Sequence, residues 1–292
     1  MKPIRTYHEL VEPDRSDLLG QVTAQRDRVA ARLATVKHVV AVASGKGGVG
    51  KSFVTASLAA ALARAGRRIG VLDADLQGPT TARMLGATEG HLQVTEVGVV
   101  PPETDDGIAV VSTELLLEEG APLRWKEPDQ ERFVWRGTLE AGMLREFLGD
   151  VVWGERDILL VDLPPGTDRL DALAQLVPSL SGVVMVTIPS DASLHAVRRA
   201  AEAAQDAHLT LLGIVENMAG YRCPSCGVLA PLFQGDAGIT LANSTGAPLL
   251  ASIPFDPDAQ AAADSGRFRP TGKVAAIFRE LGDALLDRIG AA

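Results

Sequence analysis

The stretch HVVAVASGKGGVGKS, which spans residues 38–52, decides the fold of this chain. Its first part, His38 to Ala43, is an apolar run with the length and β-branched content of a buried strand. Its second part, Gly45 to Ser52, has the form G-x-x-x-x-G-K-S of a phosphate-binding loop. The Ala-rich run Ser52 to Ala65 then predicts a helix whose positive end points at the anion. This order of strand, loop and helix favours a nucleoside triphosphate site over the alternative, an ordinary glycine-rich turn.

The residues of the loop have expected roles in binding ATP and Mg²⁺. Its glycines let backbone N–H groups turn inward around a polyphosphate, Lys51 reaches the terminal phosphates, and the Ser52 hydroxyl binds Mg²⁺. A second lysine, Lys46, follows the first glycine, where a lone lysine is more often a solvated charge. The nucleotide-binding residues predicted here are Gly45, Lys46, Gly47, Gly48, Val49, Gly50, Lys51, Ser52 and Phe53.

Beyond the loop, near-continuous apolar strands alternate with helices, which predicts an α/β fold with a mostly parallel sheet in a three-layer αβα P-loop NTPase arrangement. Residues 93–112 are typical of a strand, a turn and a returning strand, and a CxxC insertion at residues 220–235 interrupts the alternation. Residues 1–37 form an N-terminal extension with one surface helix, and residues 38–292 form the ATPase domain. The predicted strands are residues 38–43, 68–72, 157–162, 182–188, 209–215 and 247–253, and the predicted helices are residues 52–65, 138–148, 192–206 and 274–289.

Acidic residues follow two of these strands, at the sheet edge where ligands of such folds collect. Asp73 and Asp75, in LDADLQGPT, can share the orientation of Mg²⁺-bound water and of the attacking water, with Asp75 orienting the attacking water beside the metal and Asp73 in the metal shell. The alternative is that one of them caps the following turn. Asp162, in ILLVDLPPGTD, has the Walker B position and would hold Mg²⁺ through water, and Gly166 can offer its N–H to the γ-phosphate. The predicted catalytic residues are Lys46, Lys51, Asp73 and Asp75.

Two later segments are candidates for contacts with adenine. Asn217 follows an apolar strand, and its amide can both donate to and accept from the edge of the base, although an asparagine in a turn is the simpler interpretation. Pro254, Phe255 and Asp256 follow the last strand and can pack against the base on its other edge. Phe255 can equally belong to the core.

The two cysteines of the chain, Cys223 and Cys226, form one C-P-S-C-G motif. Two sulfurs at this spacing can grip one metal or cluster, but zinc and most iron–sulfur clusters take about four ligands. A two-fold dimer that brings two such motifs together supplies four thiolates at one site. A shared iron–sulfur cluster is the favoured interpretation, and a shared zinc ion or a redox-active or inert thiol pair are the alternatives.

Several motifs, in the same order, resemble the Mrp/ApbC family of iron–sulfur cluster carrier ATPases, in the SIMIBI class that also holds the MinD/ParA group. They lie within residues 36–268 and are GKGGVGKS, LDADLQGPT with MLG at 84–86, VWRG at 134–137, WGERDILLVDLPPGT at 153–167 and GIVENMAGYRCPSCG at 213–227.

The resemblance implies a MinD-like fold and a homodimer with ATP between the protomers, where Lys46 reaches the nucleotide of the facing subunit. It also implies a labile 4Fe–4S cluster, held by Cys223 and Cys226 of both protomers and passed from cluster donors to apo-proteins, with slow hydrolysis acting as a switch. The sequence departs from the family pattern in three places. Phe53 replaces a usual Thr or Ser, Thr81-Ala82-Arg83 replaces a proline-containing stretch, and Asp168-Arg169 replaces a smaller, more acidic sequence.

The charge of the chain weighs on two competing functions. A MinD/ParA-like positioning ATPase needs a basic surface or a basic amphipathic tail, but the net charge is −9 and the charges of residues 273–289 cancel. Neither a nucleic acid nor a membrane partner is therefore expected. A zinc-stapled NTPase with a client-binding role remains open. No signal-like stretch and no run of about 18 apolar residues is present, which favours a cytoplasmic protein.

Overall fold

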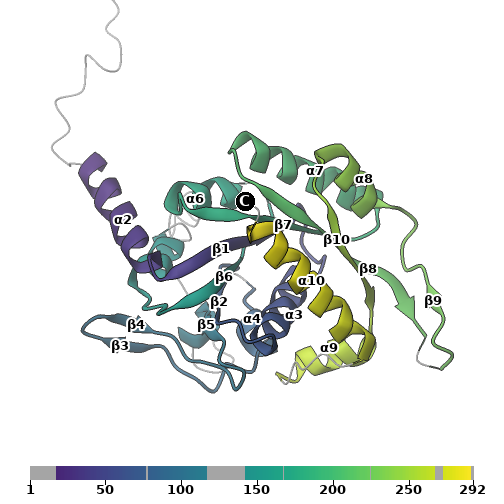
Figure 1. The fold of residues 1–292 in the computed structure, drawn as a ribbon, viewed down its shortest axis with the longest axis horizontal. Coiled ribbons are helices and arrows are strands. Elements are labelled where there is room, and N and C mark those ends of the chain that lie inside the picture. Colours follow the sequence, from purple (N-terminus) through teal and green to yellow (C-terminus); the bar gives the residue numbers. More distant parts are fainter. Residues whose placement is uncertain are drawn as a thin grey trace, which may run out of the picture.

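The structure is a computed structural model that describes residues 18–76, 78–116, 142–166, 168–223, 225–266 and 272–290. In this part of the chain an eight-stranded sheet has the order β10-β8-β7-β1-β6-β2-β5, with β9 paired to β8 (Figure 1). The neighbours from β10 to β5 are parallel, and β9 is antiparallel to β8. The bounds are β1 Val36–Ala43, β2 Ile69–Asp73, β5 Ala109–Val111, β6 Arg156–Asp162, β7 Leu180–Thr187, β8 Leu211–Arg222, β9 Leu229–Ala230 and β10 Leu249–Phe255.

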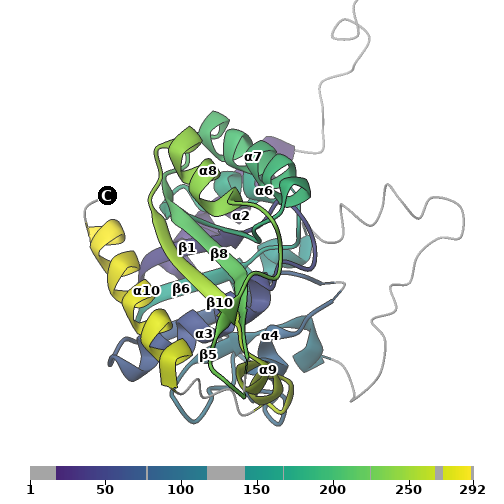
Figure 2. The same cartoon turned by 90° about the vertical axis from the view of Figure 1, so that its right-hand side faces the viewer.

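Helices cover both faces of the sheet, as Figure 2 shows, so the predicted three-layer αβα fold is confirmed. One face carries α3 Lys51–Arg64, α4 Thr81–Met84, α9 Pro257–Asp264 and α10 Gly272–Gly290. The other carries α2 Leu18–Leu33, the helical residues 142–150, α6 Asp168–Leu176, α7 Asp191–Asp206 and α8 Ala237–Thr245.

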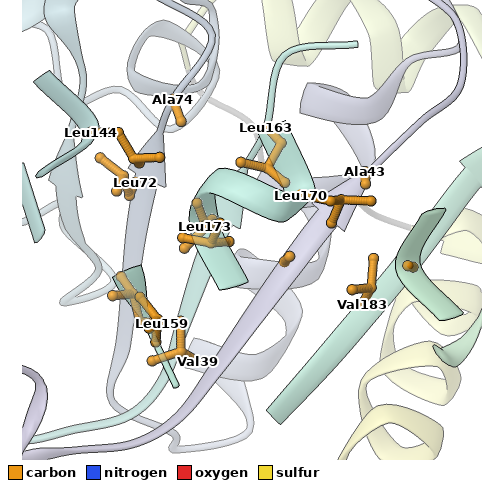
Figure 3. Packing of buried hydrophobic residues seen from close by; sticks show 14 of the residues in the cluster. Val39, Ala43, Leu72, Ala74, Leu144, Leu159, Leu163, Leu170, Leu173 and Val183 are labelled. Atoms are coloured by element: carbon orange, nitrogen blue, oxygen red, sulfur yellow. The ribbon is translucent and has the colours of Figure 1, made fainter. Parts of the chain in front are cut away.

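The alternation of side chains along β1 feeds both hydrophobic cores. Val39, Ala41 and Ala43 belong to the core on the α7 face, and Val40 and Val42 to the core on the α3 face. Because successive residues of a strand point to opposite faces, a strand segment buried on both sides must be apolar, as residues 39–43 are. Figure 3 shows part of the first core, where Val39 lies beside Leu159, and Leu170 and Leu173 lie on a helix in front of these strands.

The structure differs from the sequence prediction in residues 93–112. A short antiparallel hairpin, β3 Gln93–Thr95 and β4 Gly98–Val100, closes before the two prolines. The turn expected at residues 105–107 is present, but the strand that follows it, β5, pairs in parallel with β2 at the edge of the sheet. The predicted return of the chain is present, since Glu103 and Ala109 form an antiparallel bridge across this turn, but the parallel pairing of β5 with β2 was not predicted.

The bounds of other strands and helices also differ from the predicted ranges. β8 continues to Arg222, so Asn217 lies within a strand, and helices α8 and α9 were not predicted. α2 packs on the main body through the buried Val29 and Leu33. Several segments named in the sequence analysis lie outside the described residues. They are the start of the predicted helix at residues 138–148, the VWRG motif, Thr167, Pro224 and most of the N-terminal extension. None of the described helices is long and apolar enough to cross a membrane.

Candidate nucleotide site and thiol hairpin

The phosphate-binding loop joins the end of β1 to the start of α3, near the centre of the sheet. Gly48 and Gly50 have φ values of 77° and 78°, in the left-handed region that favours glycine. Gly45 is required for a different reason, since a Cβ there would lie 2.1 Å from the carbonyl carbon of Ala196 in α7. The loop is thus held against the backbone of a neighbouring helix, and only its outer residues, Lys46 among them, are exposed.

Three donors converge on the buried carboxylate of Asp162, at the end of β6. Lys51 Nζ donates to Oδ1 at 2.6 Å, and Thr55 Oγ1 lies 3.2 Å from the same oxygen. Thr81 Oγ1, at the start of α4, donates to Oδ2 at 3.0 Å. The loop, α3 and α4 therefore meet at the aspartate predicted to be the Walker B residue.

Asp73 lies opposite Asp162 on the neighbouring strand β2 and is also fully buried. Its carboxylate accepts the N–H groups of Asp75 at 3.1 Å, Thr80 at 3.0 Å and Thr81 at 3.0 Å, which fixes the turn that follows the strand. Burial, and then the negative charge of Asp162, raise the pKa of Asp73 to about 7. Two carboxylates confined at one place therefore carry more negative charge than Lys51 alone balances.

The carboxylate oxygens of Asp73 and Asp162 suit Mg²⁺, which prefers hard oxygen ligands and is usually held by one or two carboxylates together with substrate phosphates. Among the described residues, no group of three or more His, Cys, Asp or Glu side chains could hold a metal ion by itself. The protein oxygens therefore fit Mg²⁺ that arrives with a nucleotide. Ser52 and Asp75, the other predicted ligands, are half-buried beside the loop and after β2, respectively.

The remaining predicted contacts lie around the same edge of the sheet. Gly166, with φ of 122°, donates its N–H to the Ser44 carbonyl at 3.1 Å, directly before the phosphate-binding loop. Asn217 is buried, and its Nδ2 donates to the Val49 carbonyl at 2.9 Å. A Cβ added to Gly50 would lie only 2.2 Å from this amide nitrogen, so the two residues are in close contact. Asn217 thus braces the loop directly.

The segment after β10 has a local structural role as well. Asp256 caps α9, because its Oδ1 accepts the N–H groups of Asp258 at 3.0 Å and Ala259 at 3.1 Å. Phe255 lies 6.5 Å, centroid to centroid, from the ring of Tyr221 on β8, and Pro254 is buried. Phe53, in the first turn of α3, makes an edge-on ring contact with Phe278 of α10 at 5.9 Å.

The thiol motif lies at the tip of a hairpin formed by β8 and β9. Cys223 is half-buried and Cys226 exposed, and both are free thiols. The N–H of Gly227 donates to the Cys223 carbonyl at 2.8 Å, and the φ of Gly227, 69°, permits this tight knuckle. Hydrogen bonds from the backbone N–H groups of Cys226 and Ser225 lower the pKa of the Cys223 thiol. The hairpin therefore favours a thiolate, the form that binds metal.

Exposed apolar side chains follow this knuckle in the chain. Val228, Leu229 and Leu232 are 61%, 52% and 43% exposed. A cluster of exposed aliphatic residues beside two accessible sulfurs is characteristic of an interaction surface. We call these three residues the apolar collar.

Two residues at the nucleotide site, Thr55 and Thr81, were not among the site residues predicted from the sequence. Thr55 lies four residues after Lys51 and hence on the same side of α3, a spacing that could have identified it. Thr81 reaches Asp162 across 81 residues of sequence, and no local pattern announces that contact.

Residues 35–286 match the family model described as ParA, NUBPL iron-transfer P-loop NTPase. The chain is 40% identical over 247 residues to the iron–sulfur cluster carrier protein of Saccharolobus solfataricus, which covers 84% of this chain and 80% of that one. It is 40% identical to the cytosolic Fe–S cluster assembly factor nubp2 of Danio rerio, over 80% of this chain and 85% of that one.

Solved structures give the same picture of the fold. A nucleotide-binding protein from Archaeoglobus fulgidus in complex with ADP superposes with a TM-score of 0.69 at 37% identity, covering 84% of this chain and 94% of that one. The cell division ATPase MinD of Pyrococcus furiosus superposes with a TM-score of 0.58 at 23% identity, over 86% and 99%, and shows the likeness of fold alone.

Proposed function

Because the chain belongs to the ParA family of P-loop NTPases, in the group described as iron-transfer proteins, we propose that it is an ATP-dependent carrier of iron–sulfur clusters. The observation that carries the proposal is the placement of β8. This strand contacts the phosphate-binding loop through Asn217 and ends at the thiol hairpin with Cys223. One element therefore joins a nucleotide site to a pair of metal-binding sulfurs.

The cargo of this carrier is a 4Fe–4S cluster held between two copies of the chain. Each copy contributes Cys223 and Cys226, and two copies supply the four thiolates that such a cluster takes. The accessibility of both sulfurs, the lowered pKa of Cys223 and the apolar collar all support this assignment. Exposed sulfurs also suit a cluster that is accepted from a donor and released to an apo-protein.

The nucleotide side is assigned to residues around the loop. Backbone N–H groups of residues 45–53 bind the phosphates of ATP, and Lys51 leaves Asp162 to contact the terminal phosphates. Ser52, Asp75 and Asp162 would hold Mg²⁺, with Asp73 in the metal shell, and the bound ion would neutralise phosphate charge. Asn217 and residues 254–256 border the base.

Hydrolysis in this proposal is weak and works as a switch. Asp75 orients the attacking water, while Lys51, and Lys46 from the facing protomer, offset the charge that develops on the γ-phosphate. The N–H of Gly166 binds the γ-phosphate in place of the Ser44 carbonyl. Loss of that phosphate frees the loop after β6, and the change reaches the hairpin through β8.

The proposed carrier is a cytoplasmic homodimer whose partners are cluster donors and apo-proteins rather than nucleic acid or membrane. The acidic net charge of −9 supports that choice. Sedimentation with anionic vesicles and with DNA tests it, since salt-sensitive binding to either would favour the positioning ATPase instead.

Reciprocal variants separate the two sites. Cys223→Ser and Cys226→Ser should lose the reconstituted cluster, measured as iron and sulfide per chain, and keep the affinity for an ATP analogue. Lys51→Met should lose nucleotide affinity and keep the cluster. A single-cysteine variant that retains a full cluster, or a monomer that holds one, would contradict the bridged site. Zinc in place of iron in anaerobically purified protein would favour the zinc-stapled alternative.

A further inference from the structure

We propose that Thr81 is a positioning residue for Asp162, and that its hydroxyl keeps this carboxylate oriented toward Mg²⁺ when Lys51 turns to the nucleotide. The inference rests on the proposed role of Asp162 at the metal. Its starting point is the contact at the start of α4, where the Thr81 hydroxyl lies 3.0 Å from Asp162 Oδ2.

The hydrogen-bond donors to Asp162 differ in whether they can remain bound to it when nucleotide binds. Lys51 Nζ, at 2.6 Å, is the lysine assigned to the phosphates, so its bond to Oδ1 is lost when nucleotide binds. Thr55 has one hydroxyl proton and two acceptors, the Lys51 carbonyl at 3.0 Å and Asp162 Oδ1 at 3.2 Å, so it serves one of them at a time. In the described part of the chain, the donor to Oδ2 is the Thr81 hydroxyl. A fully buried carboxylate without a fixed donor is costly and mobile, so Thr81 has the lasting role.

Thr81 is itself held firmly in place. Its N–H donates to Asp73 Oδ2 at 3.0 Å, so one residue links the two acidic strand ends. Two positions on, Arg83 binds Glu114 Oε1 through Nε at 3.0 Å and Nη2 at 2.8 Å, which secures α4 to the segment after β5. A hydroxyl on such a fixed backbone is preorganised, which is the property expected of a group that orients a metal ligand.

Two matched pairs of variants isolate the hydroxyl. Wild type and Thr81→Val differ by a hydroxyl in place of a methyl, and Thr81→Ser and Thr81→Ala differ by the hydroxyl with the methyl absent from both. Thr113→Val is the control, because Thr113 is also a fully buried threonine beside this region but its Oγ1 has no hydrogen-bond partner among the described residues. Thermal melts identify any variant that does not fold, and either pair alone is sufficient.

The measurement is the affinity for a non-hydrolysable ATP analogue titrated with Mg²⁺, against the same measurement in EDTA. Both variants without the hydroxyl should need about tenfold more Mg²⁺, a typical effect for a group that orients a metal ligand. Their affinity in EDTA should not change, and Thr81→Ser and Thr113→Val should stay within about twofold of wild type in both.

Three results would overturn the proposal. Equal Mg²⁺ dependence within each pair would show that the hydroxyl has no such role. An equal loss in Thr113→Val would show general loosening of the region. If wild type binds the analogue without any dependence on Mg²⁺, the metal assignment of Asp162 itself fails, whereas loss of cluster binding would leave this inference untouched.

Discussion

The pairing of Lys51 with Asp162 is the most consequential contact at the scale of single residues. Both groups are buried, and Asp73 adds a second carboxylate beside them. Removing one partner of a buried ion pair leaves an uncompensated charge, which typically costs about 3 kcal/mol or more. Lys51 is thus expected to support the fold as well as the nucleotide.

Lys51→Met should therefore lower the free energy of unfolding without nucleotide by about 3 kcal/mol. Adding Asp162→Asn should recover part of that loss, since the buried charge is removed as well. Urea denaturation of wild type, both single variants and the double variant measures the coupling. Additive losses would contradict this account of the pair.

The contact between Gly45 and α7 gives a second prediction for a single residue. A Cβ at Gly45 would lie 2.1 Å from a backbone carbon, whereas one at Gly47 would have nothing nearer than a Pro165 side-chain carbon at 3.8 Å. Gly45→Ala should lower the free energy of unfolding by about 2 kcal/mol, and Gly47→Ala should change it by less than about 1 kcal/mol. Urea denaturation in the absence of nucleotide compares them, and equal effects would refute the close-packing argument.

At the scale of elements, one carboxylate fastens three strand beginnings together. Asp157 of β6 accepts from the N–H of Arg68, directly before β2, at 2.9 Å and from Lys37 of β1 at 2.9 Å. The Arg68 guanidinium adds a bond at 3.2 Å. The Arg68 N–H first, and then the Lys37 ammonium and the Arg68 guanidinium, hold the pKa of Asp157 well below its usual value. The central strands of the sheet are therefore clamped at the end opposite the nucleotide.

Asp157→Asn should destabilise the protein at neutral pH by about 1 kcal/mol, a modest value because Lys37 and Arg68 are largely exposed. A depressed pKa gives stability that is present above the unfolded-state value of 3.8 and is lost as the pH falls below it. The difference between variant and wild type should thus be constant from pH 7 to 5 and shrink below about pH 4. Urea denaturation across this range checks it, and a difference that grows in acid would reverse the assignment.

At the scale of the whole molecule, the apolar collar and the thiol knuckle occupy one end of the sheet. Replacing Val228 and Leu232 with serine should weaken the cluster-bridged dimer about tenfold, equivalent to about 1.4 kcal/mol, because the exposed aliphatic surface is removed. The matched control is serine at Val94 and Val97, which are 85% and 65% exposed on the β3–β4 hairpin, on the other side of the molecule in Figure 1. Sedimentation velocity of the reconstituted proteins compares the two, and an equal effect would argue against the collar.

The central sheet and the phosphate-binding loop were predictable because their signals are local. The apolar residues 39–43 of β1 are typical of a strand buried on both faces, and the phosphate-binding loop follows them. The pairing of β5 was not predictable, because Pro101-Pro102 mimics a turn and the choice of partner strand is a tertiary property. The start of α9 carries a signal in the sequence, Asp256 followed by Pro257, whereas Asp256 was predicted to contact the base.

The candidate site divides in the same way. The positions of Lys51 and Asp162 follow from motif and strand order, and the structure brings them together. The roles assigned to Lys46, Asp75 and the base-binding segments stay predictions. Thr81 could not be identified from the sequence, because its hydroxyl reaches Asp162 only when α4 folds back onto the end of β6.

The path of the chain from Asn217 in β8 to Cys223, directly after that strand, has a consequence for how this chain can change over time. A strand advances about 3.3 Å per residue and presents alternate residues to opposite sides. Deleting or inserting one amino acid between these two positions would displace the sulfur by about that length and would break the present register, which already contains the positive φ of Met218. The interval therefore behaves as a fixed spacer, and changes in its length would disconnect the two chemistries that it joins.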